Sequence, residues 1–137
     1  MADSVTRALE RASLDADDID LVVPHQANLR IIQAATSRLG VPESKVMVNI
    51  AHHGNTSAAS IPMALCDALD EGRVSPNDTI AITAFGGGVT WGSVIFRWGE
   101  RVSRCETSDA ALPEPTGDVF DVLAPNREFY SSYHESN

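Results

Sequence analysis

The sequence has few cysteines, few basic residues and no long apolar run, and each shortage excludes a class of protein. Two cysteines among 137 residues are too few for a disulfide framework and are typical of a reduced, cytosolic protein. Lys and Arg number 10 against 19 Asp and Glu, and the net charge of −9 disfavours nucleic acid or an anionic membrane surface as a partner. No apolar segment approaches the roughly 20 residues that span a bilayer. The CxxC and HExxH pairings of common metal sites are also missing from the sequence.

The remaining composition, 43% hydrophobic and 21% charged, is typical of one soluble globular domain. Apolar periodicity predicts helices over residues 3–13, 29–39 and 56–69, and strands over 21–23, 46–50, 79–85 and 93–98. Ser4 and Asn28 are placed to cap the first two helices, and Gly40 is placed to end the second. The order predicts an α/β fold with a mixed sheet of about four to five strands, flanked by helices and ending in an antiparallel hairpin.

Residues 101–137 differ in composition from the rest. They hold seven acidic residues against three basic ones, three prolines and no sustained periodicity, which predicts an extended tail. Apolar side chains such as Phe120, Leu123 and Tyr130 exceed the need of a spacer, so we expect the tail to dock on its own domain or on a partner. The predicted organisation is therefore a domain over 1–100 and a tail over 101–137.

Three polar or glycine-rich stretches, PHQAN, AHHGNTS and FGGGVTWG, each follow a predicted strand. Ligands gather beyond the carboxyl ends of parallel strands, so these stretches are expected to share one site. Each also has a purely structural interpretation. His25 fits a buried histidine bonded to the main chain, Asn55 a helix N-cap, and the glycines a tight hairpin. The glycine run is not a P-loop, because no GKS or GKT follows it.

Together the three stretches suit chemistry on a thioester. The Nε2–H of a neutral His25 and the side-chain amide of Asn55 are both donors. Aimed at one carbonyl oxygen, they would stabilise the charge that develops when a thioester becomes an enolate. A second oxyanion hole is expected from the main-chain N–H groups of Gly86, Gly87 and Gly88, because a substrate oxygen can approach the backbone closely where there is no Cβ. Such a site would form carbon–carbon bonds between thioesters.

The motifs PHQANLRI, HHGNTSAASIP and AFGGGVTWGS resemble, nearly letter for letter, the C-terminal half of the beta-ketoacyl-acyl-carrier-protein synthase III family. These are thiolase-fold condensing enzymes that start fatty acid and some polyketide chains. The resemblance covers residues 1 to about 98. It implies one half of a five-layer αβαβα fold and a cytoplasmic enzyme without a cofactor, whose substrates are thioesters on acyl carrier protein or coenzyme A.

The resemblance also implies roles for individual residues. His25 and Asn55 would activate a malonyl thioester for decarboxylation and hold the enolate oxygen. Among the three glycines, Gly87 would be the main N–H donor of the oxyanion hole. Asn28 would line the pantetheine channel, and Arg30 would meet the acyl carrier protein at the mouth of that channel. His52 has no implied role and is expected to be structural or to face solvent.

The family's nucleophile is a cysteine at a helix start in the N-terminal half, where the helix dipole favours the thiolate. Cys66 is expected to pack inside a helix as a small hydrophobe, and Cys105 lies in the tail without a helix start. Neither is expected to accept an acyl group. The sequence therefore predicts a hetero-oligomer in which another chain brings the cysteine.

Other interpretations stay open at this point. The chain would alternatively be a non-catalytic partner of a full-length synthase or carrier protein, or a truncated fragment. A third alternative is an acyltransferase branch of the fold that transfers to oxygen rather than carbon.

Overall fold

A computed structural model describes residues 1–103 together with residues 111, 117–118, 121 and 124. Contacts divide the chain into Met1–Cys105 and Glu106–Asn137, and all the elements below belong to the first unit. The predicted tail over 101–137 and its docking stay predictions, because most of its residues, with Cys105, lie outside the described set. Within that set, no helix is long and apolar enough to cross a membrane.

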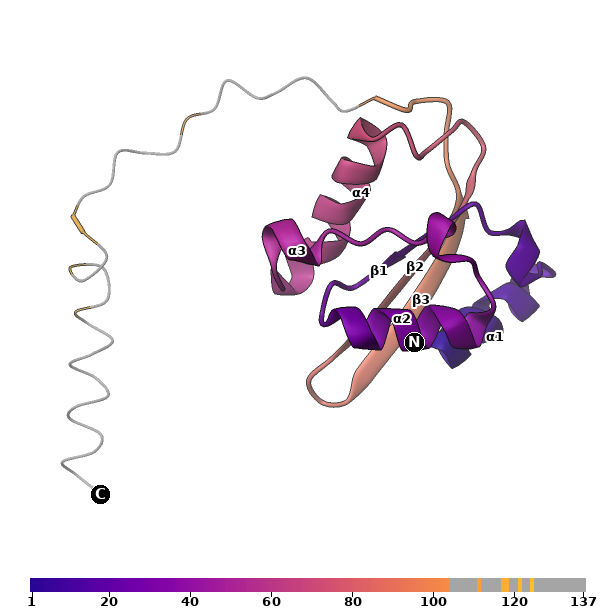
Figure 1. Cartoon of the computed structure of the whole chain (residues 1–137), viewed down its shortest axis with the longest axis horizontal. Helices are drawn as coiled ribbons and strands as arrows, with labels where there is room; N and C mark the ends of the chain where they lie inside the picture. Colours follow the sequence, from indigo (N-terminus) through magenta and orange to yellow (C-terminus); the bar gives the residue numbers. More distant parts are fainter. Residues whose placement is uncertain (104–110, 112–116, 119–120, 122–123, 125–137) are drawn as a thin grey trace. The chain divides into compact units, whose positions relative to one another are not determined.

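A mixed sheet of three strands forms the centre of the first unit (Figure 1). Its order is β1 (Leu21–Pro24), β2 (Thr79–Gly86) and β3 (Thr90–Arg97). β1 and β2 are parallel, with Val22 opposite Ala81, whereas β2 and β3 form an antiparallel hairpin. The predicted α/β class, mixed sheet and hairpin are confirmed. The predicted count of four to five strands is wrong for the described residues, because 46–50 forms only one bridge, from Val46 to Val22.

Helices cover both faces of the sheet (Figure 1). On one face, α1 (Ala2–Ala12) and α2 (Leu29–Leu39) pack against Val22. On the other face, α4 (Ser60–Asp70) packs against Leu21 and Val23. Successive strand side chains point to opposite faces, so β1 is buried on both sides, as its unbroken apolar run predicts. The remaining elements are the short helix α3 (Ile50–His53) and the 3₁₀ turns η1 (Ala16–Asp18), η2 (Glu43–Lys45) and η3 (Ser57–Ala59).

The ends of α2 follow the sequence signals, whereas the start of α1 does not. Asn28 Oδ1 accepts the main-chain N–H of Arg30 at 2.9 Å, and Gly40 ends α2 with a φ of 80°. Ser4 was predicted to cap α1, but the helix begins at Ala2 and Ser4 lies inside it. The Ser4 hydroxyl instead bonds the hydroxyl of Ser93 on β3. A tertiary contact has therefore replaced the local capping bond.

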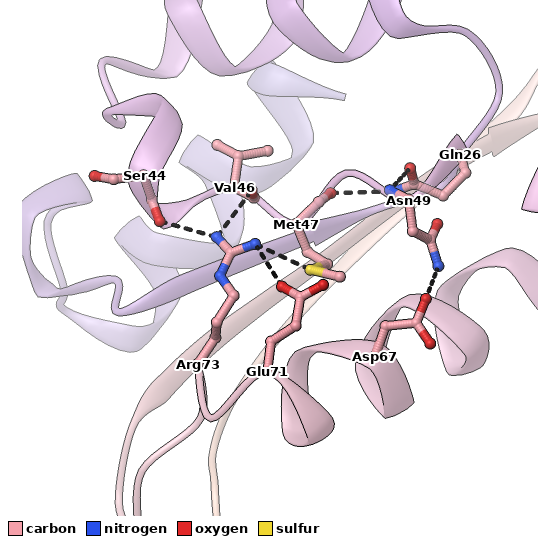
Figure 2. Close-up of polar contacts among 8 residues, drawn as sticks. All are labelled: Gln26, Ser44, Val46, Met47, Asn49, Asp67, Glu71 and Arg73. Carbon is pink, nitrogen blue, oxygen red and sulfur yellow. Dashed lines mark hydrogen bonds and ion pairs between the residues drawn. The ribbon is translucent and has the colours of Figure 1, made fainter. Parts of the chain in front are cut away.

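A buried glutamine, Gln26, explains why residues 46–50 do not form a strand. Its Nε2 donates to Pro24 O at 2.8 Å and to Met47 O at 3.2 Å. Its Oε1 accepts the main-chain N–H of Asn49 at 3.0 Å (Figure 2). These main-chain groups would otherwise belong to a strand ladder, since buried main-chain groups must be paired. The side-chain amide thus replaces the ladder, and α3 begins at the next residue.

Arg73, which follows α4, binds the N-terminal part of the same segment and the turn before it (Figure 2). Its guanidinium donates to Ser44 O at 2.9 Å and to Val46 O at 3.0 Å. A third bond reaches the sulfur of Met47 at 3.0 Å. Two long side chains from distant loops therefore fix the path that leads to the second polar stretch.

Replacing Gln26 by an apolar residue of similar size tests this role. Gln26→Leu should lower the free energy of unfolding by on the order of 3 kcal/mol, since buried main-chain groups of Met47 and Asn49 would lose their partners. Urea denaturation followed by circular dichroism measures the change. Gln33→Leu, at an exposed position of α2, is the matched control. Equal losses in both variants would contradict the assignment.

Candidate functional site

A cavity of about 450 Å³ lies where β1 and β2 end, and all three polar stretches contribute to its lining. His25 comes from the first stretch, Ser57 from the second, and Gly86 and Trp91 from the third. The carboxyl ends of parallel strands meet at one edge of a sheet, which is why stretches far apart in sequence come together there.

His25 directly follows β1 and is held by three groups. Its main-chain N–H donates to Thr83 O at 2.8 Å, which continues the pairing with β2. Its ring Nδ1 lies 2.6 Å from the hydroxyl of Ser60, the first residue of α4. Its ring contacts Phe85 edge-on, with centroids 6.1 Å apart. The ring is half-buried and bonds a hydroxyl instead of a main-chain group, and among described residues Nε2 has no partner.

Asn55 is exposed and lies two residues before the cavity-lining Ser57. Its Oδ1 accepts the main-chain N–H of Ser57 at 3.0 Å. This bond forms a turn ahead of η3, and the N-cap of α4 is Ala59, so the predicted cap of a helix over 56–69 is wrong in its position. Because the amide is planar, the bond to its oxygen also fixes where its nitrogen donor points.

The glycine turn divides its tasks among three residues. Gly86 ends β2 and lines the cavity. Gly88 has a φ of 127°, and a Cβ added there would lie 3.3 Å from the Thr90 methyl group. Gly87 has open space on its Cβ side, and its carbonyl accepts the Thr90 hydroxyl at 3.3 Å. The conformational need for glycine therefore falls on Gly88, while the predicted donor role of Gly87 stays a prediction.

The predicted carrier-binding residues lie at the start of α2. Asn28 and Arg30 are exposed, and the cavity lining does not include them. The Asn28 oxygen is occupied by the cap of α2, as described above. His52 on α3 is exposed, whereas its neighbour His53 places Nε2 2.9 Å from Asp67 Oδ2. The predicted roles of Asn28 and Arg30 stay predictions.

Cys66 does not pack as the sequence predicted. Its side chain is exposed on α4, which corrects the expectation of a small buried hydrophobe. The reason is helical spacing: α4 meets the sheet through Ala64 and Ala68, both fully buried, and a residue midway between two such positions faces the other way. Sequence reasoning also missed Ser60 and Gln26, because their partners lie far away along the chain.

Comparison with known proteins identifies the family to which the chain is similar. Residues 9–98 match the family described as 3-oxoacyl-[acyl-carrier-protein (ACP)] synthase III C terminal. A beta-ketoacyl-[acyl-carrier-protein] synthase III 2 from Vibrio cholerae is 44% identical over 124 residues, covering 90% of this chain and 34% of that protein. A beta-ketoacyl-[acyl-carrier-protein] synthase III from Listeria welshimeri is 50% identical over 100 residues, covering 73% and 32%.

The same relationship appears in three dimensions. The crystal structure of 3-oxoacyl-[acyl-carrier-protein] synthase III from Aquifex aeolicus superimposes with a TM-score of 0.70 at 50% identity, covering 72% of this chain and 32% of that one. The chain thus has the α/β fold of the C-terminal part of these thiolase-like enzymes. It spans about a third of the length of the curated relatives it matches.

A pair of alanine substitutions tests the division of tasks in the glycine turn. Gly88→Ala should lower the free energy of unfolding by about 1–3 kcal/mol, because a side chain is strained at that φ. Gly87→Ala should change it by no more than about 0.5 kcal/mol, since its Cβ would meet open space. Thermal denaturation of both variants gives the comparison. A larger loss at Gly87 would show that the turn is misassigned.

Proposed function

Because the chain belongs to the 3-oxoacyl-[acyl-carrier-protein] synthase III C-terminal family, we propose that it supplies the histidine and asparagine of a condensing active site. The observation that carries the proposal is the cavity where His25 meets the second polar stretch and the glycine turn. His25 has Nδ1 engaged by a hydroxyl and Nε2 without a described partner, which is the arrangement that a neutral donor needs.

The proposed reaction is the decarboxylative condensation of a malonyl thioester with an enzyme-bound acyl thioester. Carbon dioxide leaves, and the electron pair of the broken bond moves into an enolate. Nε2–H of His25 and the side-chain N–H of Asn55 donate to the enolate oxygen, where negative charge develops. The enolate carbon then attacks the acyl carbonyl, and the cysteine thiolate departs as the new carbon–carbon bond completes.

The glycine turn serves the second carbonyl in this proposal. When the enolate attacks the acyl thioester, negative charge develops on the acyl oxygen. Main-chain N–H groups of Gly86–Gly88, with Gly87 as the leading donor, would hold that oxygen. Gly86 lines the cavity with His25, which supports a common site for both steps.

The acyl-accepting cysteine, we propose, comes from outside these 137 residues, on a chain with the N-terminal half of the fold. Cys66 is exposed on α4 and does not line the cavity. The α4 face of the sheet also has apolar surface free for a partner. Val94 on β3 is 59% exposed, although it lies on the same face of the strand as Phe96, two residues away, which packs in the α4 cluster. Surface of this kind is typical of an interface.

The thioesters would reach this site on a pantetheine arm, from acyl carrier protein or coenzyme A. Arg30 is exposed at the first turn of α2, beside the cap residue Asn28. A basic side chain there would pair with the acidic surface of a carrier or with a coenzyme A phosphate.

A non-catalytic binding role is the second candidate. The observation that favours it is that the side-chain oxygens of both asparagines bond main-chain N–H groups nearby, Asn28 as the cap of α2 and Asn55 in a turn, so local structure alone accounts for those bonds. Such a protein would dock on a full-length synthase or a carrier and would need no donor at His25.

Reconstitution distinguishes the two functions. The full chain is co-expressed with the part of the Vibrio cholerae synthase outside the matched segment, and malonyl-thioester decarboxylation and condensation are assayed. His25→Ala and Asn55→Ala should each lower the rate by about 10²–10³-fold, the usual cost of one oxyanion donor. His52→Ala, on the exposed face of α3, should keep the rate of the parent complex.

Two results would count against catalysis. Full activity in His25→Ala or Asn55→Ala would show that the catalytic assignment is wrong. A stable complex without activity, in which all variants bind equally well, would favour the binding role instead.

The proposed interface has its own test. The chain by itself should bind a hydrophobic dye, and Val94→Lys should reduce that signal and weaken association with the N-terminal half by roughly tenfold or more, since an unpaired ammonium would be buried. Gln33→Lys on α2 controls for the added charge. A monomer that binds no dye, or a Val94→Lys variant that associates normally, would refute the interface.

A further inference from the structure

Ser60 is a buried hydroxyl that joins α4 to the loop after β1. Its side chain is 2% exposed, and its Oγ lies 2.6 Å from Nδ1 of His25. The same oxygen accepts the main-chain N–H of Gln26 at 3.3 Å. One serine on the first turn of a helix therefore contacts both the imidazole and the main chain beside it.

The two contacts together favour one direction for the hydrogen bond between Ser60 and the imidazole. A serine hydroxyl has one proton to donate and two acceptor positions. The N–H of Gln26 occupies an acceptor position. Over the part of the chain that the structure describes, the only other polar atom bonded to this oxygen is Nδ1 of His25. Donation to Nδ1 is the arrangement that also gives the hydroxyl proton an acceptor, whereas an Nδ1–H donated to the second acceptor position would leave that proton without a partner among the described residues.

We propose that Ser60 is a positioning residue that selects, for the neutral imidazole of His25, the tautomer protonated on Nε2. A neutral imidazole has one donor and one acceptor nitrogen, so a bond accepted at Nδ1 leaves the proton on Nε2. The ring of Phe85, which meets the imidazole edge-on at an interplanar angle of 71°, helps to hold the imidazole in the position where Nδ1 meets Ser60. The inference rests on the proposed function, in which Nε2–H is the donor to the enolate oxygen.

The opposite tautomer would harm the reaction. With the proton on Nδ1, Nε2 would present a lone pair to the cavity, where negative charge develops on the substrate. The donor would be lost, although the ring itself stayed in place. Ser60 would thus act through His25 without contacting substrate.

Nitrogen NMR of the full 137-residue chain tests the tautomer directly, without any partner or substrate. The ring nitrogens of His25 are assigned by comparison with His25→Gln. Parent protein should show a protonated Nε2 and an unprotonated Nδ1. Ser60→Ala should convert His25 to a mixture of tautomers. Ser37→Ala, at an exposed serine of α2, should leave the spectrum of His25 unchanged.

Two further variants separate the hydroxyl from packing. Ser60→Thr keeps the hydroxyl and should retain the parent tautomer. Ser60→Cys keeps the approximate size but is a weak donor, so it should resemble Ser60→Ala. If the added methyl group of threonine prevents folding, the cysteine and alanine variants still decide the question.

The reconstituted complex supplies the kinetic test. Ser60→Ala should lower kcat by roughly 10–100-fold, the size of effect known for hydrogen-bond partners that orient metal-bound histidines, with KM for the malonyl thioester little changed. Ser60→Thr should restore most of kcat.

The outcomes separate this inference from the function beneath it. A parent spectrum with Nδ1 protonated, or an unchanged tautomer in Ser60→Ala, would overturn the role of Ser60. A tautomer that shifts in Ser60→Ala while His25→Ala keeps full activity would uphold the Ser60 bond and overturn the proposed function.

Discussion

The side-chain amide of Gln26 links the end of β1 to Met47 and Asn49, in a segment that otherwise pairs with β1 through a single bridge. All of these bonds are buried, where an unmet polar group is costly, so the segments cannot separate without leaving several groups unpaired. Gln26 also follows His25 directly and donates its main-chain N–H to Ser60. One residue therefore sets how the first polar stretch, the start of α4 and the path toward Asn55 lie relative to each other.

Besides the bonds of Gln26, the site depends on the buried strand β1. β1 is buried on both faces, and the N–H of His25 extends its pairing with β2 by one residue beyond the strand. The cavity-lining residues His25, Ser57 and Gly86 lie on connecting segments or at a strand end, where side chains are free to face a cavity. This separation of scaffold and site is common in α/β proteins. Here the side chains of Gln26, Ser60 and Arg73 hold the connecting segments in place by hydrogen bonds.

Local signals predicted whatever depends on local interactions. Asn28 and Gly40 bound α2 because capping acts over a few residues, and the glycine turn between β2 and β3 was visible for the same reason. The segment 46–50 has the apolar pattern of a strand, but its pairing is taken by Gln26 and Arg73 from elsewhere in the chain. Ser4 lies inside α1 and bonds the hydroxyl of Ser93 instead of capping the helix. The motifs predicted roles for His25 and Asn55, and those roles stay predictions. Ser60 lies 35 residues from its histidine, and no local pattern reports such a contact.

The connections between the strands also predict the order in which the sheet forms. β2 and β3 are joined by a tight turn, so their pairing closes a short loop. β1 pairs in parallel with β2, with Val22 opposite Ala81, and that contact must close a loop of roughly 60 residues at a much greater entropic cost. We expect the hairpin and the helices to form early and the β1–β2 contact late. Since the cavity lies where those two strands end, we expect the cavity to be the last part of the domain to form during folding.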